Sequence, residues 1–330
     1  MKKLFLNWMQ RLMNWRNVMS NQVKIATREA YGKALAELGK DYEFYVLDAD
    51  LTKSTMTRFF KEDFPERHFN MGIAEGNMMS VAAGIATLGK PCFASTFAVF
   101  AAGRGCEQIR NSICYPNLNV KIGATHAGIS VGEDGASHQA VEDLGIMRSI
   151  PNMHIIQPCD AVSTKMAVKT ALETDGPFYL RLGRLTVEPV YEEGNCNFLL
   201  GKGIRLREGT DLTIITSGLM VQEVLKASEI LKSEGVHCRV IDMHTIKPID
   251  AEIIIKAARD TGRIVTVEES NILCGLGSAV AEVVSQQFPC PIKMIGIKDC
   301  FGRSGKPLEL LDYYGLTAEK ITSEIKSFIE

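Results

Sequence analysis

Apolar runs of strand length alternate with amphipathic runs of helix length along the chain from Ile25 onward. In the first series the strand-like runs are 44–50, 92–96, 119–126, 153–158 and 178–182, and the helical patterns are 27–38, 75–89, a long run ending near Ser112, 138–148 and 161–172. Buried strands separated by helices are typical of a mostly parallel sheet covered on both faces. This alternation predicts an α/β protein.

The alternation is interrupted once, and the interruption divides the chain. Residues 186–203 carry prolines, glycines and acids without periodicity, which is typical of a linker. Strand-like runs then restart at 212–218, 238–243, 263–269 and 293–297, with helical patterns between them and a final helix. A chain of 330 residues is long for one core. We therefore predict two doubly wound domains, 23–190 and 201–330, with the linker at 191–200.

Composition limits the compartment and the partners. The formal net charge is −2 and no long basic run follows the first residues, so we expect neither nucleic acid nor a membrane as a partner. The nine cysteines include no CxxC pair, which favours a cytoplasmic location and no zinc or other metal site on this chain. Residues 1–22 lack a small-residue cleavage site. We expect them to be a dispensable leader, with Met1 or Met19 as the start.

The stretch 70–77, NMGIAEGN, opens a helix that we expect to end near Gly89. Glu75 falls in its first turn, where the helix dipole favours a carboxylate, so an ordinary helix-start glutamate is one interpretation. Small residues follow at Ala82, Ala83, Gly84 and Ala86. This small-residue face fits either a tight subunit contact or packing inside its own domain.

Polar residues gather just after several predicted strands, which is where open α/β sheets bind ligands. These places are 50–54, 95–97, His126 with the loop that follows it, and Arg181 with Arg184. Three loop glycines, at 128, 132 and 135, permit a folded-back backbone. The loop lies between His126 and His138 and carries acids, so it suits a polyhydroxylated ligand. An acidic surface loop in which Ser137 caps a helix is the alternative.

Aromatic and cationic residues suggest two further binding features. Phe97 and Phe100 are three residues apart and are expected on one helix face, where they either stack on a flat heteroaromatic ring or pack in the core. Arg28, Ser54 and Arg184 have the chemistry to hold a phosphate. Each of these three is otherwise an ordinary solvated or ion-paired side chain.

Together these residues resemble the transketolase family, specifically its pyrimidine-binding and C-terminal domains, over essentially all of 23–330. The motifs that carry the resemblance are GIAEGNM, STFAVF and GEDGASHQAVEDLG, followed by TIKPID and VEESNILCGLGSAVAE. The resemblance implies a thiamine-diphosphate-binding fold of the pyrimidine type followed by a fold like the transketolase C-terminal domain.

The resemblance also implies roles around the cofactor. Glu75 matches the glutamate that shares a proton with N1′ of the aminopyrimidine of thiamine diphosphate. Phe97 and Phe100 look like members of the aromatic pocket around that ring, and Asp50 matches an aspartate close to the cofactor. A third aromatic residue common in the family falls at Gly103, so the pocket is expected to be more open or to be completed from elsewhere.

For the sugar, Asp134 and His138 match residues that bind hydroxyls near the scissile bond, and with Glu75 they are the catalytic candidates. The residues that match a distal phosphate site are Arg28, Ser54, His126 and Arg184. Arg184 is preferred to Arg181 because of its spacing after Pro177. Ala127 replaces an aspartate frequent in the family, which leaves the substrate preference open at that point.

No Gly-Asp-Gly motif, which transketolases use for the diphosphate and a divalent metal, occurs in the 330 residues. The resemblance therefore implies the C-terminal half of a split transketolase, inactive alone. A separate N-terminal subunit would share thiamine diphosphate and carry Mg²⁺, in an α2β2 assembly that contains a homodimer of this chain. The expected reaction moves a two-carbon ketol unit from a ketose phosphate to an aldose phosphate in the pentose phosphate pathway.

Three alternatives remain. Half of a 1-deoxyxylulose-5-phosphate synthase is disfavoured because Arg28, Ser54 and His126 together look like transketolase. The β subunit of a 2-oxoacid dehydrogenase is disfavoured by the loop GEDGASHQ. A non-catalytic assembly subunit is disfavoured because a purely structural role would not require Glu75, Asp134 and His138 all to be present.

Overall fold

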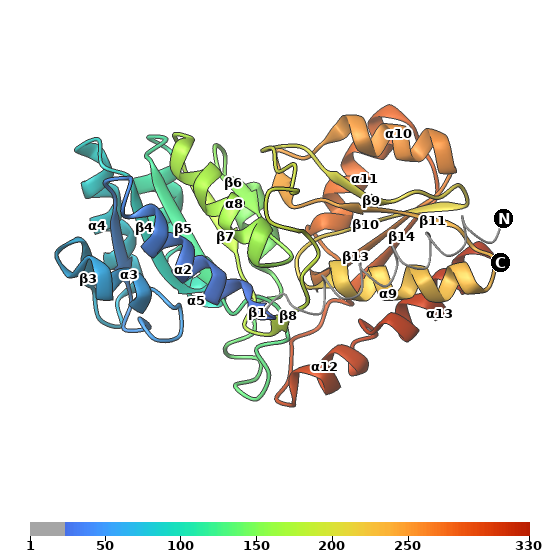
Figure 1. Cartoon of the computed structure of the whole chain (residues 1–330), viewed down its shortest axis with the longest axis horizontal. Coiled ribbons are helices and arrows are strands. Elements are labelled where there is room, and N and C mark those ends of the chain that lie inside the picture. The colour runs from blue at the N-terminus through green and yellow to red at the C-terminus, as the bar shows by residue number, and fades with distance from the viewer. Residues whose placement is uncertain (1–23) are drawn as a thin grey trace, which may run out of the picture.

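The chain folds around two β-sheets, each covered by helices on both faces (Figure 1). A computed structural model describes residues 24–330. The expected leader, 1–22, and both candidate start positions lie outside the described residues. We refer to 24–190 as the first domain and to 201–330 as the second domain. The predicted α/β class with mostly parallel sheets is confirmed.

The first sheet has the strand order β12-β6-β7-β5-β4-β2-β3. Its strands are β2 (Tyr45–Asp48), β3 (His68–Asn70), β4 (Cys92–Phe97), β5 (Val120–Thr125), β6 (His154–Ile156), β7 (Phe178–Arg181) and β12 (Thr245–Lys247). All neighbours are parallel except β12, which pairs antiparallel with β6. Every residue of β4 and β5 is buried, as expected for central strands covered on both sides.

Helices cover the two faces of the first sheet. α2 (Thr27–Leu38) and α8 (Ala161–Glu173) pack together on one face, and α4 (Glu75–Thr87), α5 (Ala98–Arg104) and α7 (Asp143–Ser149) lie on the other. Shorter elements are α3 (Arg58–Asp63), η1 (Pro65–Arg67), α6 (Cys106–Gln108) and the π-helical η2 (Ile109–Cys114). α8 begins with a capping box in which Asp160 accepts from the Ser163 amide.

The second sheet has the order β14-β13-β10-β11-β9. Its strands are β9 (Ile204–Arg207), β10 (Leu212–Thr216), β11 (Cys238–Asp242), β13 (Ile264–Asn271) and β14 (Ile292–Ile297), and only β9 is antiparallel to its neighbour. The helices around it are α9 (Met220–Ser233), α10 (Ala251–Thr261), α11 (Leu276–Gln287), α12 (Pro307–Tyr313) and α13 (Ala318–Ile329). The short strands β1 (Ile25–Ala26) and β8 (Thr186–Val187) pair outside both sheets.

Several predicted helices have different limits. The long helix ending near Ser112 is interrupted at Gly105, whose φ and ψ are −94° and −2°, and continues as α6 and η2 to Cys114. The helix predicted over 138–148 begins only at Asp143, since Ala140 forms an isolated bridge with Ala127. The final helix is two helices, α12 and α13, separated at Gly315, whose φ is 75°.

The two domains are joined by more than the linker. β12 follows β11 in sequence but completes the edge of the first sheet. One hydrophobic cluster also runs across the boundary and contains Met78 and Ile122 together with Ile215 and Leu276. This continuity fixes the relative position of the two sheets.

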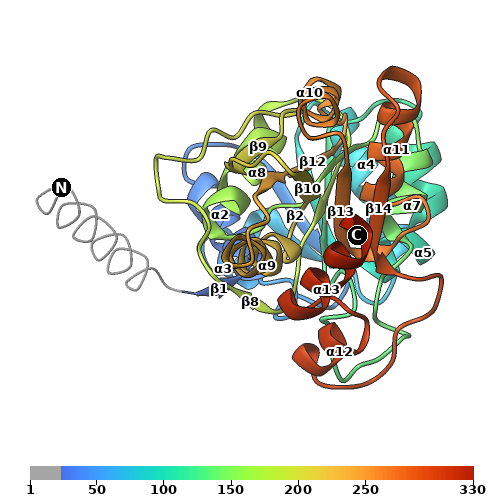
Figure 2. The same cartoon turned by 90° about the vertical axis from the view of Figure 1, so that its right-hand side faces the viewer.

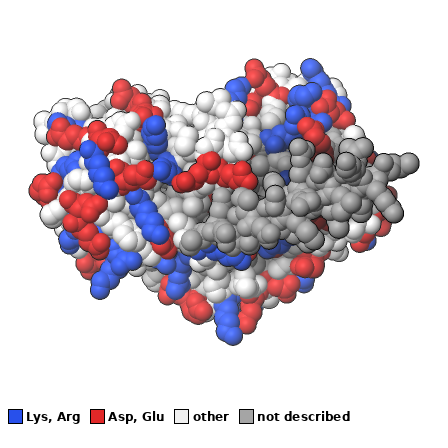
Figure 3. Space-filling view, in the orientation of Figure 1, with Lys and Arg blue, Asp and Glu red and all other residues white. Residues whose placement is uncertain are grey.

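The small-residue face on α4 packs mainly inside its own domain. Ala82, Ala83 and Ala86 are buried, whereas Gly84 is exposed and a Cβ added there would meet no atom within 4 Å. Acidic and basic side chains are intermixed over the surface shown in Figure 3. No helix within residues 24–330 is both long and apolar enough to span a membrane.

Candidate active site

Glu75 is the first residue of α4 and is only 4% exposed. Its Oε1 lies 3.2 Å from Nη1 of Arg104, at the end of α5. The same guanidinium lies over the Phe100 ring, 4.3 Å from the centroid. The carboxylate is therefore held at a helix start and connected through one cation to an aromatic ring. Arg104 was not predicted, although its position four residues after Phe100 places both on one helix face.

The predicted aromatic pair lies beside this carboxylate. Phe97 is the last residue of β4 and not part of the helix, but its ring stacks on Phe100 with centroids 5.6 Å apart and an interplanar angle of 10°. His126 stacks on Phe97 at 3.8 Å, and His138 meets Phe100 edge-on at 5.5 Å. A Cβ added at Gly103 would meet nothing within 4 Å. The residues thus form one aromatic cluster with an open neighbouring position.

His126 is buried just after β5 with a φ of 57°. Its Nε2 lies 3.3 Å from Nη1 of Arg28, which also donates to the backbone oxygen of Ser54 at 2.8 Å. Burial, followed by the charges of Arg28 and Arg184, lowers the pKa of His126 to about 3. Burial and the nearby charge of Arg184 also lower the pKa of Arg28. These groups form a positively charged corner suited to an anion.

Arg184 lies at the same corner and contacts the loop after β5. Its Nη1 donates to the backbone oxygen of Val131 and lies 3.2 Å from Oδ2 of Asp134. Arg181, the other arginine of this segment, is buried and paired with Asp143 at 2.8 Å. Arg184 therefore faces the loop, whereas Arg181 is enclosed in the protein.

His138 lies at the far end of that loop. Its Nδ1 is 2.9 Å from Oγ of Ser137. The alternative in which Ser137 caps a helix is wrong, because α7 starts only at Asp143. The Ser137 contact leaves Nε2 of His138 as the ring nitrogen available to a ligand.

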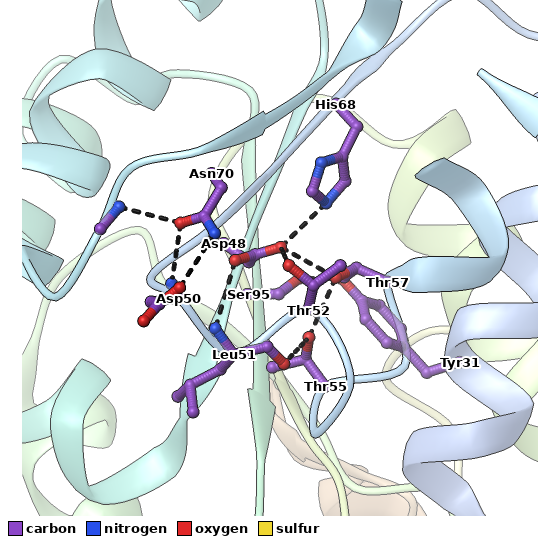
Figure 4. A network of polar contacts seen from close by, with 11 residues as sticks. Tyr31, Asp48, Asp50, Leu51, Thr52, Thr55, Thr57, His68, Asn70 and Ser95 are labelled. Carbon is purple, nitrogen blue, oxygen red and sulfur yellow. Dashed lines mark hydrogen bonds and ion pairs between the residues drawn. The ribbon is translucent and has the colours of Figure 1, made fainter. Parts of the chain in front are cut away.

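Asp50 belongs to a polar network at the ends of β2 and β3 (Figure 4). Oδ1 of Asn70 accepts from the amides of Asp50 at 3.0 Å and Gly72 at 2.9 Å, while its Nδ2 donates to Asp50 Oδ1 at 3.1 Å. Asn70 therefore ties the loop after β2 to the turn that precedes α4. Asp50 itself has a φ of 62°, which this bonding stabilises.

Asp48 holds the same loop from inside the protein. It accepts from the hydroxyls of Thr52 at 2.7 Å and Thr57 at 3.2 Å, and Nε2 of His68 lies 2.9 Å from its Oδ2. Burial alone would raise the pKa of Asp48, but the contacts with His68 and Thr52 hold it below its ordinary value. The loop it fixes carries Ser54 and lines a cleft of about 470 Å³. Neither Asp48 nor His68 was predicted as a site residue. Asp48 ends the otherwise apolar strand β2, whereas β3, which carries His68, was itself not predicted.

Stacked phenyl rings beside a buried carboxylate fit a flat heteroaromatic ring with a basic nitrogen. Glu75, Phe97 and Phe100 are the residues that would hold such a ring. Within residues 24–330 no group of three or more His, Cys, Asp or Glu side chains is arranged to bind a metal. The buried Glu75 and the ring pair Phe97 and Phe100 fit the aminopyrimidine half of thiamine diphosphate.

Comparisons with known proteins identify the class. The pyrimidine-binding domain of transketolase matches residues 23–189, and the transketolase C-terminal domain matches residues 201–321. The chain belongs to the transketolase family. Membership implies a transferase-type enzyme that depends on thiamine diphosphate.

Similar proteins indicate which members of the family this chain resembles over most of its length. A protein of Methanocaldococcus jannaschii, provisionally named transketolase C-terminal section, is 54% identical over 301 residues, which cover 90% of this chain and 94% of that protein. The 6-deoxy-6-sulfo-D-fructose transketolase subunit SqwH of a Clostridium species is 40% identical over 89% of this chain and 91% of that protein. A solved structure described as a split-gene transketolase, inactive β4 tetramer, has a TM-score of 0.86 and 54% identity, covering 92% of this chain and 98% of that one.

Proposed function

We propose that this chain is the C-terminal subunit of a thiamine-diphosphate-dependent transketolase that moves a two-carbon ketol unit from a ketose phosphate to an aldose phosphate. A separately encoded N-terminal subunit would complete the enzyme. The proposal is supported by relatives of similar length that are named as sections or subunits of transketolases.

The observation that carries the proposal is the continuous set of contacts around Glu75. The carboxylate pairs with Arg104, Arg104 lies on Phe100, and Phe100 meets His138 of the loop. The carboxylate, the stacked rings and the loop histidine are therefore connected at the carboxyl ends of strands in the first sheet, where they would share a proton with the cofactor, hold its flat ring and bind a sugar hydroxyl.

The residues of this chain would divide the work as follows. Glu75 would share a proton with the ring nitrogen of the cofactor, and Phe97 and Phe100 would hold the flat ring. When bound, thiamine diphosphate supplies the electron sink that allows a carbon–carbon bond to break and form. His138 and Asp134 would bind the sugar hydroxyls near that bond, and Asp50 would lie close to the cofactor.

The positively charged corner would hold the distal phosphate. Arg28 and Arg184 can present guanidinium groups to its oxygens. The neutral His126 would border the site and orient Arg28, whose Nη1 lies 3.3 Å from Nε2 of the ring. Ser54 lies on the loop held by Asp48, and because its backbone oxygen accepts from Arg28 at 2.8 Å, its hydroxyl would join the same corner. Arg184 contacts Val131 and Asp134 through Nη1, so its Nε and Nη2 would be the donors offered to a phosphate.

The assembly is part of the same proposal. The partner subunit would carry Mg²⁺ and bind the diphosphate, and the complex would contain two copies of each chain in the cytoplasm, serving the pentose phosphate pathway. Support comes from the split-gene relative, whose assembly of β chains alone is described as an inactive tetramer.

The test is turnover of xylulose 5-phosphate and ribose 5-phosphate with thiamine diphosphate and Mg²⁺, with this chain alone, the candidate N-terminal chain alone, and both. Activity only with both chains supports the proposal. Pyruvate used as a donor with release of carbon dioxide would instead favour the deoxyxylulose-phosphate synthase alternative. No turnover by an assembled, cofactor-loaded complex would contradict the choice of these substrates.

The same experiment should also test a second donor substrate, a sulfosugar. SqwH is named for a sulfosugar, and a sulfonate is an oxyanion that Arg28 and Arg184 can bind as they would a phosphate. Faster turnover of 6-deoxy-6-sulfofructose than of xylulose 5-phosphate would assign the sulfosugar as the donor.

A further inference from the structure

We propose that the second domain sets the conformation of the loop 126–142, and that Glu269 on β13 is a positioning residue that acts on this loop through Ser130. The role given to the loop rests on the function proposed above, because Asp134 and His138 are its substrate-binding candidates. The physical contact between Glu269 and the loop is independent of that function.

The contact is direct and buried. Glu269 is only 3% exposed, and its Oε1 accepts a hydrogen bond from the backbone amide of Ser130 at 2.7 Å. Gly128, two residues earlier, makes the approach possible, since a Cβ at that position would lie 2.4 Å from Cδ of Glu269. A side chain on residue 128 would push the loop away from β13.

A second set of contacts holds the loop from the segment before α12. Nε2 of Gln139 donates to the backbone oxygens of Ile129 at 3.0 Å and Gly132 at 3.3 Å, and to that of Arg303 at 3.0 Å. The amide of Gln139 thus links two points of the loop to the second domain. A Cβ at Gly302 would lie 1.8 Å from Oε1 of Gln139, so the two segments touch without space between them.

The remaining loop glycines mark further close approaches. A Cβ at Gly135 would lie 2.4 Å from Oγ of Ser304, and one at Gly132 would lie 3.0 Å from the ring of Pro307. Figures 1 and 2 both show the loop, coloured green, beside α12. The glycines that the sequence suggested for a folded-back backbone therefore also allow the second domain to pack against the loop.

The position of Glu269 is itself fixed by the first sheet. Nη2 of Arg181 donates to the backbone oxygens of Glu269 and Ala140, both at 3.1 Å. Arg181 is held in turn by Asp143 through two bonds of 2.8 and 3.0 Å. The two ends of the loop are thus anchored on the first sheet, while its middle is held by the second domain.

This arrangement gives the second domain a specific task. Asp134 and His138 lie within the span that Glu269 and Gln139 hold, so a shift of the loop would move both away from the sugar. Catalytic and binding groups need placement within a fraction of an ångström, and loops rely on supporting contacts for it. Loss of the Glu269 contact should therefore weaken sugar-phosphate binding more than cofactor binding.

Adjacent glutamates on β13 provide a matched test. Glu268 is as buried as Glu269, but its oxygens accept from the amides of Leu276 at 2.7 Å and Gly277 at 2.8 Å, entirely within the second domain. The variants are Glu269→Ala, Glu269→Gln, which keeps an oxygen acceptor of the same shape, and the control Glu268→Ala. Each is assembled with the N-terminal subunit, and KM for the sugar phosphates, kcat and thiamine diphosphate affinity are measured separately.

Glu269→Ala is expected to raise KM by roughly tenfold or more, the effect of losing one charge-assisted hydrogen bond, with cofactor affinity unchanged. Glu269→Gln should restore most of the binding, and Glu268→Ala should leave KM unchanged even if it lowers stability. An equal rise of KM in Glu268→Ala and Glu269→Ala, or none in Glu269→Ala, would overturn the proposal.

Hydrogen exchange separates this proposal from the proposed function. In the full chain, Glu269→Ala should speed exchange of the amides over 128–138 by roughly tenfold or more, whereas Glu268→Ala should not. The exchange rates test whether Glu269 holds the loop even if the complex turns over no sugar phosphate. If Glu269→Ala does not fold, Gly302→Ala, which pushes on Gln139 from the second domain, should speed exchange of the same amides, and unchanged exchange there would contradict the proposal.

Discussion

Nη1 of Arg28 lies 3.3 Å from Nε2 of His126, while Nδ1 of the same histidine lies 2.9 Å from Oγ1 of Thr125. A guanidinium group is always a donor, so Nε2 of His126 must accept and Nδ1 must carry the proton. The histidine is thereby kept neutral next to a cation. This is the form in which it can border an anion site without adding charge of its own.

The first prediction concerns the pH dependence of stability. The pKa of His126 falls from 6.5 to about 3 on folding, so below pH 6.5 the unfolded chain binds a proton that the folded chain does not. This linkage lowers the unfolding free energy by about 1.4 kcal/mol per pH unit as the pH falls from 6.5 towards 3. His126→Asn should lose this part of the acid destabilisation. Urea unfolding of both proteins across that range measures the difference, and parallel pH profiles would contradict the assignment.

The second prediction concerns Glu75. Glu75→Gln in the complex with the N-terminal subunit should reduce turnover by about two to four orders of magnitude, because an amide cannot share a proton with the cofactor ring. Assembly, measured by sedimentation, should be unchanged. Glu107→Gln, at an exposed site on α6, is the matched control and should retain activity. Near-normal turnover of Glu75→Gln would refute the assigned role.

The third prediction concerns the buried pair Asp143–Arg181. Asp143→Ala should lower the unfolding free energy by about 3–5 kcal/mol, because it leaves the Arg181 guanidinium buried without its counter-ion. Adding Arg181→Met should recover part of that loss. Denaturant titrations of the two single variants and the double variant give the coupling energy.

The exposed pair Lys306–Glu309 is the control for this cycle, and its coupling should stay below about 1 kcal/mol. If the coupling energy of Asp143 and Arg181 were also below about 1 kcal/mol, the ion pair would not hold the end of the loop 126–142 in place.

The fourth prediction concerns Asp242 at the domain boundary. Oδ2 of this buried carboxyl accepts from Tyr191 Oη at 2.8 Å and from Cys159 Sγ at 3.5 Å. Burial raises its pKa from 3.8 to about 7. The folded chain therefore binds a proton that the unfolded chain has lost, and stability falls by about 1.4 kcal/mol per unit as the pH rises from 3.8 towards 7.

Asp242→Asn should remove that fall, because the amide stays neutral. The unfolding free energy of the variant minus that of the wild-type chain should therefore be larger near neutral pH than at acid pH. Thermal unfolding followed at several pH values tests this, and a stability difference that does not change with pH would show that Asp242 does not titrate in this range.

Local sequence was sufficient for most of the secondary structure and for the position of polar residues just after several strands. The alternation of apolar runs predicted both sheets, because the period of apolar residues along the chain reflects which faces are buried. Glu75 was placed correctly at a helix start. Sequence pattern missed β3, β9 and β12, which lie at the edges of the two sheets, and the small β1–β8 pair.

The resemblance grouped Arg28 with His126 at one expected phosphate site, but only the tertiary structure shows which distant groups are in direct contact. Arg28 and His126 are 98 residues apart, and Ser130 and Glu269 are 139 apart; their pairing depends on how the sheets and domains pack, which no local pattern encodes. The same holds for Ala82, Ala83 and Ala86, whose small side chains suit a subunit contact or a core equally until the fold buries them. The sequence by itself determined the elements and the chemistry at their ends, because both depend on neighbouring residues. The fold decided the contacts, because they depend on cooperative packing across the whole chain.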